Sequence, residues 1–200
     1  MREPLLSIVI VSYEDSSLFL QRVIQSVYEQ SYDNCEMILV DANDPESAYS
    51  LGLREDMEHY PDICLISCPC RKESFAAAKN AGAQQAGGTY LAFLMPGDVW
   101  NHEFASSQIE VLEERPEVAL VFCNRGMSEE DVLDTEYRKT PESVAGMEDL
   151  DDVFQKEIVG SVSQMMFRRS CFEDVHGFDT RIYKKDDYDL WIRIMKKYKI

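Results

Sequence analysis

The chain has 200 residues, of which 45% are hydrophobic and 28% charged, and this composition is typical of one globular domain with a substantial core. Lys and Arg number 20 against 37 Asp and Glu, and the net charge of −17 argues against binding to nucleic acid or to anionic lipid surfaces. No apolar run reaches the roughly 20 residues that span a bilayer, and no signal-peptide pattern follows Met1. We therefore expect a cytoplasmic protein whose six cysteines are reduced.

Apolar runs that end in polar turns alternate with helical patterns through the first 115 residues. The first run, 6–11, is rich in β-branched residues, and the helical pattern at 18–30 follows it with Ser16 or Ser17 as N-cap. Further strands are expected at 37–40, 63–67, 90–94 and 118–123, and further helices at 46–60, 75–86 and 102–115. This alternation predicts an α/β fold with a mostly parallel, Rossmann-like sheet and helices on both faces.

The pattern changes after Cys123. Residues 128–157 contain eleven acidic and three basic residues, which predicts a solvated excursion of loop and short helix. Order is expected to return at 161–167, followed by a short helix at 171–175 and an amphipathic helix at 186–197.

Three cysteines, Cys64, Cys68 and Cys70, lie close together in the sequence. A thiolate metal site usually needs a second such pair, and the three His residues are scattered along the chain. We interpret these cysteines as small buried hydrophobic residues at a strand and its exit, with a metal site as the alternative.

Polar or acidic turns at 12–15, 41–44 and 95–98 follow three of the predicted strands, where parallel sheets bind their ligands. The chain lacks the glycine patterns of a dinucleotide cradle or a P-loop, and it lacks a nucleophile elbow. Carboxylates at this edge could bind a pyrophosphate through Mg²⁺ or Mn²⁺. Asp186 and Asp187, at a helix start, are candidates for a general base.

Five segments resemble, in order, glycosyltransferase family 2, the inverting GT-A enzymes that use nucleotide-diphospho sugars. The first three segments carry the opening strand with its Ser-Tyr-Glu loop, a Val-Asp strand end, and an Ala-Lys-Asn-Ala-Gly helix with its following strand, at 7–14, 38–41 and 78–94. Residues 95–100 stand where the family has Asp-x-Asp-Asp-x-Trp, and the last segment resembles Gly-Phe-Asp and Glu-Asp-Tyr-Asp-Leu-Trp at 177–179 and 186–191. The resemblance extends over residues 5–200.

The resemblance implies a single GT-A glycosyltransferase domain over 1–200, with a nucleotide-sugar-binding half at 1–123 and an acceptor-side half at 124–200. It implies that Asp98 is the metal ligand and that Asp187 is the general base for the acceptor hydroxyl. Substrate contacts are implied for Ser12, Tyr13, Glu14, Asp41, Lys79 and Asn80. Family members continue beyond the position of Ile200, so we expect the chain to be part of a longer protein that could lie at the inner face of a membrane.

Several residues depart from the family pattern. Met95 and Gly97 occupy the two positions of Asp-x-Asp, and Ala42 replaces an aspartate that contacts the base in relatives. Lys79 replaces an arginine and Asp186 replaces a glutamate, so both keep their charge. These changes imply either a shifted donor specificity or a weakened metal affinity.

Our first hypothesis is a metal-assisted glycosyltransferase of polysaccharide biosynthesis. It would move a sugar with inversion from a nucleotide-diphospho donor, UDP-linked by preference, to a glycan or lipid-linked acceptor hydroxyl. The alternative is a catalytically weakened or inactive GT-A-like domain that binds nucleotide or serves as an interaction module. Neither hypothesis involves nucleic acid, and neither fixes the oligomeric state.

Overall fold

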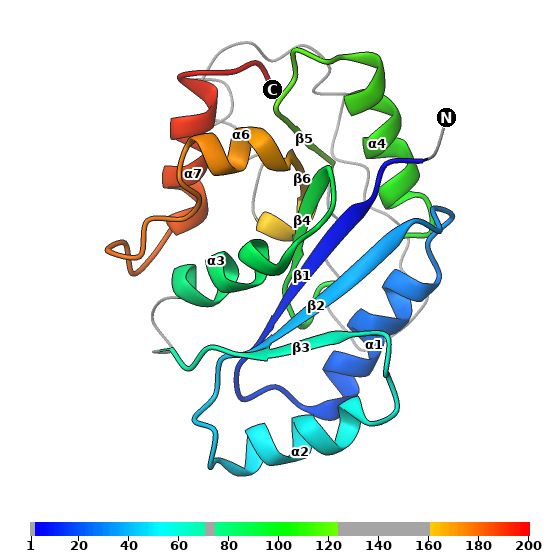
Figure 1. Cartoon of the computed structure of the whole chain (residues 1–200), viewed down its shortest axis with the longest axis vertical. Helices are drawn as coiled ribbons and strands as arrows, with labels where there is room; N and C mark the ends of the chain where they lie inside the picture. Colours follow the sequence, from blue (N-terminus) through cyan, green and yellow to red (C-terminus); the bar gives the residue numbers. More distant parts are fainter. Residues whose placement is uncertain (1–2, 71–74, 124–160) are drawn as a thin grey trace, which may run out of the picture.

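The computed structural model describes residues 3–70, 75–123 and 161–200. Within these residues one sheet has the strand order β3-β2-β1-β4-β6-β5 (Figure 1). Its strands are β1 Leu6–Ser12, β2 Cys35–Asp41, β3 Cys64–Ser67, β4 Tyr90–Leu94, β5 Leu120–Phe122 and β6 Met165–Arg168. Strands β1 to β4 run parallel, whereas β6 is antiparallel to both of its neighbours, β4 and β5.

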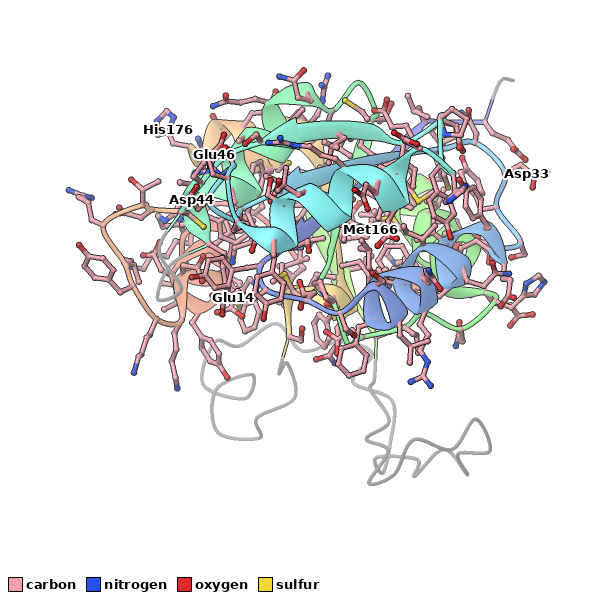
Figure 2. The ribbon with its side chains drawn as sticks, turned by 90° about the horizontal axis from the view of Figure 1, so that it is seen from below. Glu14, Asp33, Asp44, Glu46, Met166 and His176 are labelled. Atoms are coloured by element: carbon pink, nitrogen blue, oxygen red, sulfur yellow. The ribbon has the colours of Figure 1, made fainter. Side chains whose placement is uncertain are left out.

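The parallel register brings the carboxyl ends of the central strands together. Ser12, the last residue of β1, pairs with Asp41, the last residue of β2. Figure 2 shows the next residues at one end of the molecule, with Glu14, Asp44 and Glu46 far from Asp33, which precedes β2. The polar turns predicted to follow the strands therefore share one edge of the sheet.

Helices cover both faces of the sheet because alternate residues of each buried strand point to opposite sides. Leu6, Ile8 and Ile10 of β1 belong to one core cluster, and Val9 and Val11 belong to the other. The first cluster is covered by α1 Ser17–Tyr28, α2 Ala48–Met57 and α4 Phe104–Glu114. The second is covered by α3 Ala76–Gln85, α6 Arg169–Asp174 and α7 Asp186–Met195 (Figure 1).

Helix α3 packs closely on the sheet because its residues are small. A Cβ atom on Gly82 would lie 2.3 Å from Cγ1 of Val9 in the central strand. Ala76, Ala78 and Ala83 are buried against the same core cluster. This close approach brings Lys79, one turn earlier in α3, near the carboxyl edge of the sheet.

The predicted α/β fold with a mostly parallel sheet is confirmed. Ser16 caps α1 by accepting a hydrogen bond from the Phe19 N–H, and Ser47 caps α2 in the same way. Helix α2 therefore begins at Ala48, and it ends at Met57, so it is shorter than the predicted 46–60. Residues 161–167 form the short 3₁₀ helix η1 Val162–Gln164 and then β6, whose place between β4 and β5 was not predicted. The acidic segment 128–157 lies outside the described residues, and none of the described helices is long and apolar enough to cross a bilayer.

Candidate active site

A buried hydrogen-bond network joins the loop after β1 to the end of β2. Asp41 is 1% exposed, and its Oδ1 accepts hydrogen bonds from both the backbone and the side-chain nitrogen of Asn43, at 3.0 and 2.9 Å. Its Oδ2 accepts a hydrogen bond of 2.5 Å from Ser50 Oγ in α2. The Asn43 Oδ1 in turn accepts from the backbone N–H of Glu14 at 2.8 Å. Both oxygens of Asp41 are thus bonded to protein donors, which fixes the shape of the first loop.

The first loop also carries the predicted substrate contacts Ser12 and Tyr13. Ser12 is buried, and its carbonyl accepts a hydrogen bond from the Ala42 N–H at 2.9 Å. Tyr13 is half-buried and lies against Phe75, with ring centroids 5.6 Å apart. The Tyr13 N–H donates to Asp15 Oδ2 at 2.8 Å, and burial of Asp15 raises the pKa of its carboxyl group.

The loop after β4 carries the predicted metal ligand, Asp98. The Asp98 N–H donates to the Met95 carbonyl at 3.0 Å, and the turn is closed by Gly97, whose φ of 96° suits glycine. Asp98 is exposed, and its Oδ2 accepts a hydrogen bond from Ser161 Oγ at 3.1 Å.

Residues of η1 support this loop from the second part of the chain. Ser163 Oγ accepts a hydrogen bond from the Met95 N–H at 3.0 Å, and its carbonyl accepts one from Trp100 Nε1 at 2.7 Å. The indole of Trp100 is buried and stacks on Phe104 at 4.0 Å. Trp100 thus packs under the loop that presents Asp98.

The donor set around Asp98 sets a limit on how a cation could bind. Among residues 3–70, 75–123 and 161–200, no group of three or more His, Cys, Asp or Glu is placed to hold a metal ion. One exposed carboxylate and one serine hydroxyl do not make a complete protein site. They do fit Mg²⁺ or Mn²⁺ shared with substrate phosphates and water, because such ions often take only one or two protein carboxylates.

The predicted base lies at the start of α7, beside an unusual lysine. Lys79 is 5% exposed, and its Nζ lies 2.6 Å from Asp186 Oδ2 and 4.1 Å from the centre of the Phe178 ring. Burial raises the pKa of Asp187, and the positive charge of Lys79 and a hydrogen bond from the Tyr188 N–H reduce this effect. Asp187 is therefore a stronger proton acceptor than an exposed aspartate.

Asn80, the residue after Lys79, connects α3 to the turn that precedes α7. Its Nδ2 donates to the Phe178 carbonyl at 2.8 Å, and its Oδ1 accepts from the Phe178 N–H at 2.9 Å. Gly177 has a φ of 64°, and a Cβ there would lie 2.6 Å from Asn80 Oδ1. Lys79 and Asn80, both predicted to contact substrate, therefore have their polar groups in contacts within the protein.

The three clustered cysteines line the β3 edge of the sheet. Cys64 is exposed and Cys68 and Cys70 are half-buried, so the prediction of small buried residues is wrong for Cys64. A short strand at the edge of the sheet leaves its outward side chains in solvent, which explains the exposure. All six cysteines are free, and burial raises the pKa of Cys70 to about 11.

The structure thus groups the predicted residues into a first loop tied to Asp41, the loop after β4 with Asp98, and a cluster of Lys79, Asp186 and Asp187. The residues that hold these loops in place, Asn43, Asp15, Ser161 and Ser163, were not among the predicted site residues. Asn43 stands two residues after Asp41, a spacing typical of an Asx turn, and this signal was available.

The family model described as Glycosyl transferase family 2 matches residues 7–176. The chain belongs to glycosyl transferase family 2. The prediction of a glycosyltransferase is therefore confirmed at the level of the family.

Two curated proteins are similar to this chain over nearly its whole length. TuaG of Bacillus subtilis, named as a teichuronic acid biosynthesis glycosyltransferase, is 26% identical over 98% of this chain and 73% of its own length. WfaP of Escherichia coli, named as a UDP-Glc:α-D-GlcNAc-diphosphoundecaprenol β-1,3-glucosyltransferase, is 24% identical over 96% of this chain and 71% of its own length.

Solved structures show the same fold. S. aureus TarS in complex with UDP-GlcNAc superposes with a TM-score of 0.73 at 14% identity, over 97% of this chain. The mannosyltransferase PcManGT of Pyrobaculum calidifontis, in complex with GDP-Man and Mn²⁺, gives 0.70 at 19% identity, over 99% of this chain. The chain spans 54% of each of these solved chains. The predicted GT-A fold is thereby confirmed.

Proposed function

We propose that the protein transfers a sugar, with inversion, from a UDP-linked donor to an acceptor hydroxyl. The observation that carries this proposal is the half-buried Asp187 at the N-terminus of α7, with a raised pKa, in a chain of this family. The name of WfaP and the TarS complex with UDP-GlcNAc support UDP as the nucleotide, although the PcManGT structure is a complex with GDP-Man.

The acceptor in this proposal is a glycan or a lipid-linked glycan of polysaccharide biosynthesis. Support comes from the teichuronic acid pathway in the name of TuaG and from the diphosphoundecaprenol acceptor in the name of WfaP. A lipid-linked acceptor would place the reaction at the cytoplasmic face of a membrane.

In the proposed reaction, Asp187 accepts the proton of the acceptor hydroxyl as the oxygen attacks the anomeric carbon. The bond between that carbon and the donor phosphate oxygen breaks, and the nucleoside diphosphate leaves with the bonding electrons. Attack from the side opposite the leaving group inverts the anomeric centre. The raised pKa of Asp187 favours this proton transfer, because a base works best when its pKa approaches the working pH.

The first loop and Asp98 serve the donor end in this proposal. Ser12, Tyr13 and Glu14 would contact the nucleoside, while Asp41 keeps the loop in shape through Asn43 and Ser50. A bound divalent cation would offset the negative charge of the leaving diphosphate. Asp98 would hold that cation together with the phosphate oxygens.

The test of the base is Asp187→Asn, which removes the proton acceptor and keeps the shape of the side chain. With a UDP-sugar donor and a lipid-diphosphate acceptor, the transfer rate should fall about 10²–10⁴-fold while UDP binding by calorimetry stays the same. The matched control is Asp189→Asn, the same change two residues later on α7, where the ion pair with Arg193 is lost. A rate equal to that of the wild type for Asp187→Asn would contradict the proposal.

A second candidate function is a GT-A-like domain that binds nucleotide with little or no catalysis. Met95 and Gly97 favour this second function, because they leave Asp98 as the carboxylate of the loop after β4. Ala42 also favours it, because it replaces an aspartate of the family pattern after β2. Calorimetry with UDP, with and without Mn²⁺, and with Asp98→Asn separates the two. Metal-dependent binding that Asp98→Asn abolishes favours the enzyme, whereas metal-independent binding without turnover favours this second function.

A further inference from the structure

Two departures from the family motifs lie in contact with each other. Lys79 stands for the arginine of one motif, and Asp186 stands for the glutamate of another, more than 100 positions apart. The structure places Lys79 Nζ 2.6 Å from Asp186 Oδ2, with 6% and 15% of the two side chains exposed. The two residues thus form a buried ion pair between α3 and α7, which lie on the same side of the sheet (Figure 1).

The surroundings of Lys79 compensate for the burial of its ammonium group. A buried lysine is costly unless it is paired. Here Asp186 supplies the opposite charge and the face of Phe178 supplies a cation–π contact at 4.1 Å. The Phe178 backbone is itself held by Asn80, the neighbour of Lys79 on α3. The ammonium group therefore has a fixed position at the start of α7.

The pair also determines which of the two adjacent carboxylates is engaged. Asp186 forms the direct ion pair with Lys79. Asp187 is not part of this ion pair, but the positive charge of Lys79 still acts on its carboxyl group. Among the described residues, the side-chain charges that act on Asp187 are Lys79 of α3, which favours its ionised form, and Asp186 of α7, which opposes it. The helix dipole at the N-terminus of α7 also favours the ionised form of Asp187.

We propose that Lys79 is a positioning residue for the base: its ion pair with Asp186 fixes the first turn of α7 and leaves Asp187 ionised and available to the acceptor hydroxyl. This inference rests on the proposed role of Asp187. It assigns Lys79 to the acceptor side of the reaction rather than to the donor.

The test uses two variants with opposite expected effects on the pH profile of kcat/KM. Lys79→Met removes the positive charge, so the acid limb should move to higher pH by about one unit, the lower end of the effect of a nearby opposite charge. Asp186→Asn removes the negative charge and frees Lys79 to act on Asp187, so the acid limb should move to lower pH. Lys79→Arg should keep the limb of the wild type, and Lys196→Met, on an exposed lysine of the same region, is the matched control.

A purely structural role for Lys79 would lower the rate at all pH values without these opposite shifts, and that result would overturn the proposal. A second readout does not depend on turnover. The carboxyl carbon of Asp187 can be titrated by ¹³C NMR in ¹³C-Asp-labelled protein and assigned by its absence in Asp187→Asn. The same opposite shifts are expected there, and unchanged titration in both variants would contradict the inference.

These experiments distinguish a failure of the proposed role of Lys79 from a failure of the proposed function. If Asp187→Asn keeps full activity, the assignment of Asp187 as the general base is wrong, independently of the results for Lys79. If Asp187→Asn is inactive and the two pH profiles do not move, the role of Lys79 is wrong and the base stands. Should Lys79→Met fail to fold, Asp186→Asn and Lys79→Arg still test the inference, because both keep the lysine or its charge.

Discussion

At the scale of single residues, the ionised Asp187 lowers the stability of the fold. Its pKa is raised in the folded state above the ordinary value, mainly by burial. Above its folded pKa the carboxylate is ionised in both the folded and the unfolded chain, and the folded chain bears the cost of burying that charge. Below the ordinary pKa of aspartate the group is protonated in both states, and the cost disappears.

We therefore expect Asp187→Asn to be more stable than the wild type at pH 7. The gain in melting temperature should shrink as the pH falls through the folded pKa and then the unfolded pKa of Asp187, and it should vanish below both. Thermal unfolding at pH 7, 5 and 3 measures this. A less stable variant at pH 7 would mean that the hydrogen bonds of the carboxylate outweigh its burial, and a stable, inactive variant shows that activity was not lost through unfolding.

Asp41 has the opposite effect, because its two oxygens bond donors that are themselves buried. Asp41→Ala leaves the side chains of Ser50 and Asn43 without their acceptor, which should cost at least about 1–3 kcal/mol in the free energy of unfolding. The control is Asp44→Ala in the same turn, where an exposed carboxylate accepts a hydrogen bond from the Glu46 N–H, and the expected change is about 0.5 kcal/mol or less. Urea unfolding measures both variants, and equal losses would show that the network contributes little.

The sequence alone predicted candidate site residues but not what they bond. Strand ends and a helix start pointed to carboxylates at this edge of the sheet, and the family resemblance implied the roles of Asp41, Asp98 and Asp187. The burial of Lys79 could not be predicted, because an isolated lysine is normally exposed and its partner Asp186 is distant in the chain. The contacts of Asp98 and Met95 with Ser161 and Ser163 likewise depend on a fold that brings the second part of the chain back to the sheet.

At the scale of elements, the helix that carries Lys79 to Asp186, α3, packs closely against β1. Gly82 allows this approach, since a Cβ there would lie 2.3 Å from a buried valine methyl group. Gly52, in α2, has nothing within 4 Å of the same position. The two glycines are thus in helices of equal length but in opposite surroundings.

Substituting each glycine by alanine separates packing from helix propensity. Gly52→Ala should raise stability by up to about 1 kcal/mol, because alanine favours the helix. Gly82→Ala has the same gain but must displace Val9, and we expect a net loss of about 1–3 kcal/mol. Chemical denaturation measures both, and a gain of stability in Gly82→Ala would show that α3 can move away from the sheet at little cost.

Among the elements, β1 to β4 were predictable because each is a short apolar run closed by polar residues. The pairing of β6 was not predictable, because its sequence, Met-Met-Phe-Arg, indicates an apolar segment but not the strands beside which it lies. Its place between β4 and β5 follows from pairing with segments more than 40 residues away. The start of α2 lies two residues after the predicted position 46, because Ser47 caps its first turn.

At the scale of the whole molecule, the net charge of −17 means that the folded chain repels itself. Salt should relieve this repulsion, because the Debye length falls from about 30 Å at 0.01 M to about 8 Å at 0.15 M ionic strength. Relief of about 1 kcal/mol would raise the melting temperature at pH 7 by about 2–4 °C.

The control for this prediction is the same salt series near pH 4.5, the isoelectric point of the sequence, where the rise should vanish. A melting temperature that falls with salt at pH 7 would show that ion pairs such as Lys197 with Asp174 outweigh the repulsion.

The antiparallel strand β6 has a consequence for the synthesis of the chain. In the described sheet β5 contacts β6 as its neighbouring strand, and β6 also covers the open edge of β4. While the ribosome has released only the residues up to about 123, β4 can pair with β1, but the edges of β4 and β5 that face β6 in the finished sheet have no strand to pair with. The nascent sheet is therefore completed only after residue 168 has emerged, and a fragment cut after β5 would expose an aggregation-prone edge.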